Sequence, residues 1–242
     1  MAYHEVLMMA MTRMRSGICT AGYINQQHPG SGLQWVRPVK EHGSLLLGDM
    51  SDASHRVIQI GDVIELNLLR PRPDPVHAED WLTDFVKHRP RLLRQLTGEK
   101  RADFLRKYVD VNPADVLTHH RRSLCLVHPQ MLWSAFSLDD YSGKYDARIG
   151  FELAGLAHAR ANSPRGLPVT DLKWRALGRD WLSQDNRNEL NLNCAALHQR
   201  LSAEAIYLTI GLSRTFQGDI WPLIVGVYPI PDYTAVIDYD NL

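Results

Sequence analysis

The chain of 242 residues carries 27 basic and 27 acidic residues, so its formal net charge is zero, and 45% of its residues are hydrophobic. This composition is ordinary for a globular domain and excludes a protein that holds nucleic acid by its overall charge. Its three widely spaced cysteines indicate neither a disulfide framework nor a zinc site. No stretch is long and apolar enough for a membrane helix. We therefore expect a cytoplasmic protein of one large domain or two small ones, with no membrane association.

The first 75 residues are predicted to form a small β-barrel. Its apolar runs are separated by turn signals, among them His28–Gly32 and the pair Gly61-Asp62. The alternating prolines of 70–75 cannot donate to a sheet ladder, so they are predicted to end this unit. The predicted strands are 6–11, 17–24, 33–39, 57–60 and 63–69.

Residues 76–122 are predicted to be a helical, basic connecting segment. Asp80 is interpreted as the cap of a first helix, Pro90 as the start of a second, and 99–109 has the apolar spacing of a third. From 86 to 122 there are ten Lys and Arg against four Asp and Glu. Such a surface is suited to a phosphate backbone, although a charge-rich helix more often presents a solvated face of ion pairs.

Residues 123–242 return to β structure, with one helix at 171–182 and an Asn-rich loop at 184–193. The overall class is therefore mainly β with α insertions (α+β). Two small barrels joined by a helical segment would produce this order, and so would one α+β domain. The predicted strands of this part are 123–127, 132–136, 147–153, 205–212 and 222–228.

Trp35 and Arg37 are the strongest candidates for binding. They lie two positions apart on a predicted strand and therefore point to one face. An aromatic ring beside a guanidinium can stack a base and hold a phosphate. This hypothesis predicts that replacing both by Ala weakens oligonucleotide binding without unfolding the protein. The alternative is that Trp35 packs in a core and Arg37 pairs with an acid.

No catalytic residue, metal ligand set or cofactor is predicted. The sequence contains none of the motifs GxxxxGK[ST], GxGxxG, HExxH or GxSxG. The adjacent histidines His119 and His120 point to opposite faces of an extended chain and have no partner at a familiar metal-ligand spacing.

Several short motifs, taken in order, resemble the dual-OB domain family, which occurs in bacterial genomic neighbourhoods linked to defence against foreign nucleic acid. They are the W-[IV]-R-P-V motif at Trp35–Val39, the strand Gly61–Leu69, the element Val169–Asp171 and the ending Leu208–Gly218. The resemblance implies two OB-like barrels and nucleic-acid binding or sensing, and no known catalytic residue.

The remaining candidate binding residues follow predicted strands or lie at the start of the predicted helix 171–182. Arg13 and Arg15 follow the first strand, where an exit loop of an OB fold can border the ligand groove. Thr170, Asp171, Lys173 and Trp174 form a second polar-aromatic cluster, although Thr170 or Asp171 most simply caps the following helix. The full predicted nucleic-acid-binding set is Arg13, Arg15, Trp35, Arg37, Lys40, Lys173, Trp174 and Arg214.

These observations favour a non-catalytic module that binds or senses DNA or RNA, within a bacterial defence assembly. One alternative is an adaptor that contacts a protein encoded nearby through the helical segment, which a neutral chain would suit. Another is an enzyme acting on a nucleotide or nucleic acid without a recognisable motif.

Overall fold

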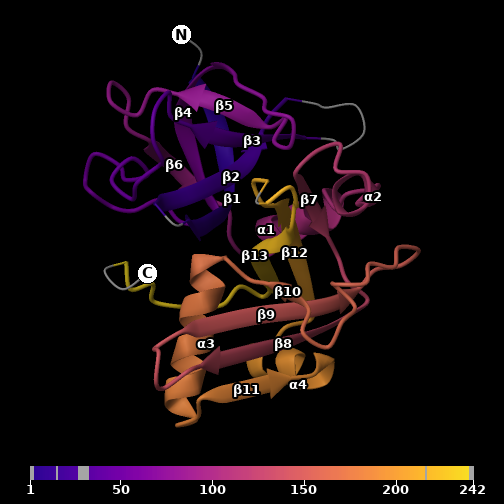
Figure 1. Cartoon of the computed structure of the whole chain (residues 1–242). Helices are drawn as coiled ribbons and strands as arrows, with labels where there is room; N and C mark the ends of the chain where they lie inside the picture. The colour runs from indigo at the N-terminus through magenta and orange to yellow at the C-terminus, as the bar shows by residue number, and fades with distance from the viewer. Residues whose placement is uncertain (1–2, 15, 27–32, 216, 240–242) are drawn as a thin grey trace.

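The computed structural model describes residues 3–14, 16–26, 33–215 and 217–239. Its N-terminal part is a closed five-stranded barrel (Figure 1). Strand β1 pairs with both β2 and β4, and β3 pairs in parallel with β5, so the ring runs β1-β2-β3-β5-β4 and back to β1. A small five-stranded barrel of this kind is an OB-like unit. Its strands are β1 (Tyr3–Met14), β2 (Gly17–Ile24), β3 (Gln34–Val39), β4 (Asp62–Pro71) and β5 (Asp80–Thr83).

The barrel interior is filled by alternate residues of these strands, which is the pattern that a two-residue side-chain period requires. Val36 lies in this interior core, whereas its neighbour Trp35 belongs to a different cluster on the outer face. The interior also contains Val6, Met8, Ile64 and Leu66, all at most 1% exposed. The predicted first barrel is therefore confirmed as an OB-like unit, but the run 57–60 is no strand, since only Val57 forms an isolated bridge.

The helical prediction for residues 76–122 is wrong over its first half. Strand β5 closes the barrel, and β6 (Arg91–Gln95) pairs with β4 as a sixth strand outside the ring of five. Tertiary pairing overrides a local helix signal in such short segments, and Asp80 is a strand residue rather than a cap. The predicted helix near 99–109 is confirmed as α1 (Gly98–Lys107), and α2 (Ala114–Leu117) follows it. The division into 1–75, 76–122 and 123–242 stays a prediction.

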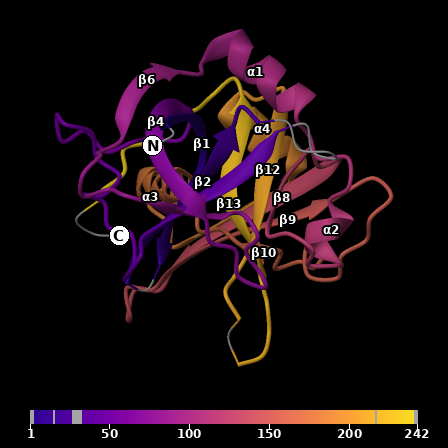
Figure 2. The ribbon, with the colours of Figure 1, turned by 90° about the horizontal axis from the view of Figure 1, so that it is seen from above.

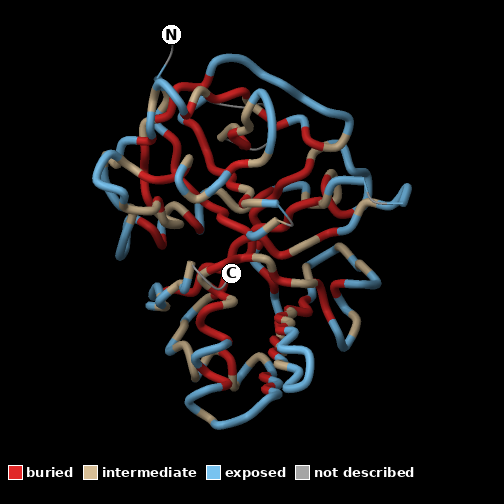
Figure 3. The backbone as a smooth tube through the Cα atoms, turned by 60° about the vertical axis from the view of Figure 1, so that its left-hand side comes forward, coloured by how far each residue is buried: buried red, intermediate tan, exposed pale blue. Residues whose placement is uncertain are grey.

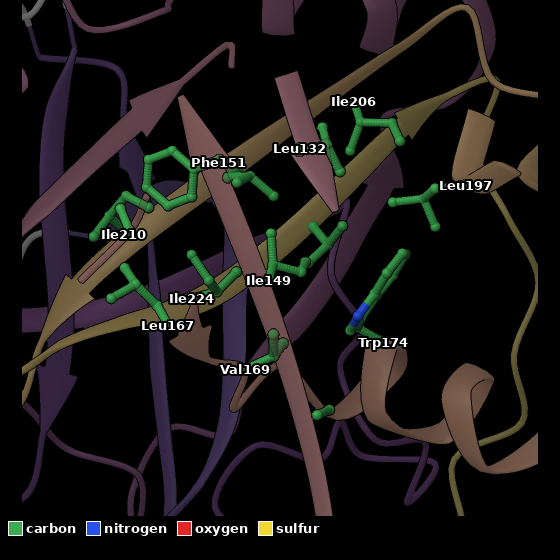
Figure 4. Close-up of a cluster of buried hydrophobic side chains, with 14 of the residues drawn as sticks. Leu132, Ile149, Phe151, Leu167, Val169, Trp174, Leu197, Ile206, Ile210 and Ile224 are labelled. Atoms are coloured by element: carbon green, nitrogen blue, oxygen red, sulfur yellow. The ribbon is translucent and has the colours of Figure 1, made fainter. Parts of the chain in front are cut away.

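The C-terminal part consists of two sheets that enclose a second hydrophobic core. The sheet β10-β9-β8-β11 and the sheet β13-β12-β7 are joined by a bridge between Val169 and Ile224. Figure 4 shows side chains from both sheets and from two helices meeting in this core. The elements are β7 (Leu124–Val127), β8 (Met131–Leu138), β9 (Tyr145–Glu152), β10 (Leu167–Pro168), α3 (Leu172–Gln184), β11 (Glu189–Leu192), α4 (Cys194–Leu201), β12 (Ala205–Leu212) and β13 (Pro222–Ile230).

The helix predicted at 171–182 is confirmed as α3, but the loop predicted at 184–193 is wrong in its second half. Residues 189–192 form β11, which pairs with β8. Asn193 caps α4, its side chain accepting a hydrogen bond from the backbone N–H of Ala196 at 2.9 Å. Asparagine is a favoured helix cap, so this part of the Asn-rich tract has a structural role.

The sheet β7-β12-β13 lies between the two cores, and both of its faces are buried (Figure 1). On β7, Cys125 and Val127 face the second core, whereas Leu124 and Leu126 pack towards the first barrel. Buried backbone accordingly gathers where the two parts meet (Figure 3). The two units therefore share a packed junction. None of the described helices is long and apolar enough to span a membrane.

Candidate nucleic-acid interface

A cavity of about 710 Å³ lies between the first barrel and the shared sheet. One wall consists of β2, β3, the end of β1 and the loop between β4 and β5, and the other of residues from β7, β12 and β13. OB folds bind oligonucleotides on the face of strands 2 and 3 and with the loops that join strands 1 to 2 and 4 to 5. The cavity therefore occupies the ligand face of the first barrel, and its volume is within the range of ligand pockets.

Three arginines on the cavity wall have no ion pair with a carboxylate of the described residues. Arg13 is exposed at the end of β1, and Arg214 is exposed just after β12. Arg72 donates from Nη1 to the carbonyl oxygens of Lys40 and Glu41, at 2.7 and 3.0 Å. Their charges are thus available to an anion entering the cavity.

Arg37 also lines the cavity, but its guanidinium is held by Asp80 on the neighbouring strand β5. Nε donates to Oδ1 at 2.7 Å and Nη2 to Oδ2 at 3.1 Å, with both side chains less than a tenth exposed. Burial raises the pKa of Asp80, and the charge of Arg37 opposes that rise. This bidentate pair links the two parallel strands that close the barrel. Lys40 is likewise paired, with Asp49 at 2.9 Å.

The prediction that Trp35 stacks a base is wrong. Its side chain does lie on the outer face of the barrel, but it is only 4% exposed and packs against Tyr23, with ring centroids 3.9 Å apart. Helix α1 covers this end of the face, where Phe104 meets the ring of Tyr23 edge-on. The outer face of β2 and β3 is therefore closed at its Trp35 end and open at its Arg37 end.

Of the second predicted cluster, Thr170 lines the cavity, whereas Lys173 and Trp174 do not. Trp174 is fully buried in the second core, against Phe136 and Trp181. Lys173 forms an ion pair with Asp232 at 3.0 Å. Of the eight predicted binding residues, the structure brings together Arg13, Arg37, Lys40 and Arg214, while Arg15 lies outside the described residues.

The basic segment 86–122 does not contribute to the cavity wall. Most of its arginines are neutralised by nearby carboxylates. The segment is therefore largely a solvated face of ion pairs, which is the alternative to a phosphate-binding surface given above. The pairs are Arg91 with Glu65, Arg94 with Glu5, Arg101 with Asp232, Arg106 with Glu99 and Asp103, Arg121 with Asp115 and Arg122 with Asp110.

Two further polar side chains of the wall, Cys19 and Thr20, come from β2. Burial raises the pKa of the Cys19 thiol, which keeps it protonated at neutral pH. The hydroxyl of Thr20 is buried without a hydrogen-bond partner among the described residues. No group of three or more His, Cys, Asp and Glu in the described ranges is placed to hold a metal ion.

The sequence interpretation does not identify Arg72 as a binding residue. Arg72 was assigned to a proline-rich exit, but this exit is the loop between strands 4 and 5 of the barrel. The implied OB topology was the one signal that pointed to this loop, because loops in that position border the ligand in OB folds.

A model of one protein family, described as a dual OB-containing domain, matches residues 4–227. The chain belongs to this family. Comparison with curated proteins and with solved structures found no match. Membership in the dual OB-containing domain family agrees with the mostly β architecture and its OB-like units. It also gives the chain a potential for nucleic-acid binding, which is a frequent use of OB folds.

Proposed function

We propose that this dual OB-containing domain is a non-catalytic module that binds single-stranded nucleic acid in the cavity between its two units. The observation that carries the proposal is the position of Arg13, Arg72 and Arg214. Three guanidinium groups without carboxylate partners in the described part of the chain border the ligand face of an OB-like barrel. In the basic segment 86–122, by contrast, most of the arginines are paired with carboxylates.

The wall of the cavity fits a nucleotide in two further respects. Apolar side chains such as Leu45, Leu212 and Val225 line it and can contact a base or sugar, while the arginines bind phosphate. A cavity of about 710 Å³ is too confined for a duplex but suits one or two unpaired nucleotides.

The test is fluorescence anisotropy with labelled 12-nucleotide single strands of DNA and RNA at several salt concentrations. We expect the combined variant Arg13→Ala and Arg214→Ala to bind at least tenfold more weakly at about 0.1 M salt. Each lost phosphate contact also lowers the slope of log affinity against log salt by about 0.7. Both side chains are exposed, so the fold is expected to persist.

The matched control is the combined variant Arg91→Ala and Arg94→Ala, which removes two exposed arginines from β6, away from the cavity. It is expected to bind as the unaltered protein does. Failure of the unaltered protein to bind either strand, or an equal loss in the control, would refute the proposed function.

The proposal extends to a sensing role in bacterial defence, together with a protein encoded nearby. This part is supported by the family resemblance of the motifs around Trp35–Val39 and Leu208–Gly218. Its test is co-purification of the chain with the products of neighbouring genes, in the presence and absence of a bound oligonucleotide.

A further inference from the structure

An exposed tryptophan stacked by an arginine lies at the base of the loop between β12 and β13. Trp221 is 39% exposed, and the guanidinium carbon of Arg160 lies 3.6 Å from the centroid of its ring. Arg160 is itself exposed and comes from the loop after β9. The loop that carries Trp221 projects beyond the body of the molecule (Figure 2).

Trp221 adjoins the rim of the cavity. Its carbonyl oxygen accepts a hydrogen bond from the backbone N–H of Ser213 at 2.8 Å, and its own N–H donates to Ser213 Oγ at 2.9 Å. Ser213 and the next residue, Arg214, both line the cavity. The backbone of Trp221 is therefore held directly across the hairpin from Ser213, a residue of the cavity wall.

We infer that the Trp221–Arg160 pair is a base-stacking platform for the nucleotide that follows the one in the cavity. This inference rests on the proposed function. Indole rings and guanidinium planes both stack on bases, and such stacking tolerates any sequence. Arg214 lines the cavity and directly follows Ser213 in the chain, so it is the residue we expect to contact the phosphate that joins the two nucleotides. The ligand is thus a nucleic-acid strand of at least two nucleotides. Trp221, and not the buried Trp35, is the residue that stacks a base in this inference.

The alternative role for the pair is to hold the hairpin loop in place, and the salt dependence of binding separates the two. A stacking contact involves no phosphate, so its loss lowers affinity without changing the salt slope. A loop that loses its shape displaces Arg214, and the salt slope then falls together with affinity.

The experiment measures anisotropy of a labelled 12-nucleotide strand at several salt concentrations with Trp221→Ala and Trp221→Phe. We expect Trp221→Ala to weaken binding by about 5-fold to 150-fold with an unchanged salt slope, and Trp221→Phe to retain most of the affinity. The control is Tyr141→Ala, which removes a fully exposed ring from the β8–β9 hairpin and leaves affinity unchanged.

Two results would overturn the platform while leaving the proposed function intact. In the first, Trp221→Ala binds as tightly as the unaltered protein. In the second, Trp221→Ala loses affinity and its salt slope also falls. Absence of binding by the unaltered protein is a different result, because it refutes the proposed function itself.

Discussion

At the scale of single residues, Arg37 shows how one side chain can lie in a binding cavity and still serve the fold. Its bidentate pair with Asp80 is buried and links β3 to β5, the two parallel strands that close the barrel. Replacing Trp35 and Arg37 together by Ala is therefore no clean test of binding. Trp35→Ala opens a cavity in a hydrophobic cluster, and Arg37→Ala leaves the carboxylate of Asp80 buried without its partner.

Removing the acidic partner of this pair is expected to destabilise the protein strongly. Asp80→Ala leaves the guanidinium of Arg37 buried and unpaired, which costs about 3–5 kcal/mol of the free energy of unfolding. The control is Glu5→Ala, which breaks the exposed pair with Arg94 and costs less than about 1 kcal/mol. Urea denaturation followed by circular dichroism measures both, and equal losses would contradict the structural role of the pair.

Asp171 makes stability depend on pH. It is fully buried, caps α3 by accepting from the N–H of Trp174 at 3.1 Å, and also accepts from the N–H of Val227 at 2.8 Å. Burial outweighs these hydrogen bonds and raises the pKa of Asp171 to about 6. The folded protein therefore retains a proton that the unfolded chain releases, so this stabilisation is present at low pH and is lost as pH rises through about 6.

We expect the free energy of unfolding to fall by up to about 3 kcal/mol through this group between about pH 4 and pH 7. Asp171→Asn cannot titrate, so the difference between the two proteins is the measurement, taken by urea denaturation at several pH values. A difference that does not vary with pH in this window would rule out Asp171 as the titrating group.

At the scale of elements, the sheet β7-β12-β13 determines which parts of the barrel surface are covered. Strand β13 approaches β1 closely, since the hydroxyl of Tyr228 donates to the carbonyl oxygen of Met9. Gly226 lies at this contact, and a Cβ atom there would overlap the phenol of Tyr228 and lie 2.7 Å from the same carbonyl oxygen. The close approach of β13 to β1 therefore depends on the lack of a side chain at Gly226.

Gly226→Ala is therefore expected to destabilise the protein by about 1–3 kcal/mol, because the added methyl forces β13 away from β1. Gly48→Ala is the matched control, since a Cβ atom at Gly48 meets no described atom within 4 Å. Thermal unfolding of both variants compares them directly. A melting temperature for Gly226→Ala equal to that of the control would show that the junction tolerates extra volume.

At the scale of the whole molecule, the two units enclose the cavity because they share one packed sheet. The walls of the cavity come from segments as distant as Arg13, Arg72 and Arg214. Such a junction fixes the backbone positions of these three arginines relative to one another before any ligand arrives, which reduces the entropy that binding must overcome. A neutral chain can in this way present a local positive site without a basic surface overall.

Much of the strand and helix pattern could be predicted, because long apolar runs and capping residues are local signals. The runs at 6–11 and 205–212 and the helix at α3 are examples. Strands β5 and β11 were missed, because each is four residues long and is stabilised by pairing with a distant strand. The candidate site was predictable only in part for the same reason. Arg13 and Arg214 were selected, but their meeting depends on the junction of the two units.

The sequence by itself determined the β-rich class and the alternation that places Trp35 and Arg37 on the same face of one strand. These follow from the two-residue period of strands, which needs no knowledge of the rest of the chain. Only the tertiary structure decided which end of that face is open. Helix α1 and the shared sheet bury Trp35, Asp80 pairs with Arg37, and the arginines without carboxylate partners lie around the end that remains. Burial and pairing are properties of contacts between distant segments, so no local pattern could have specified them.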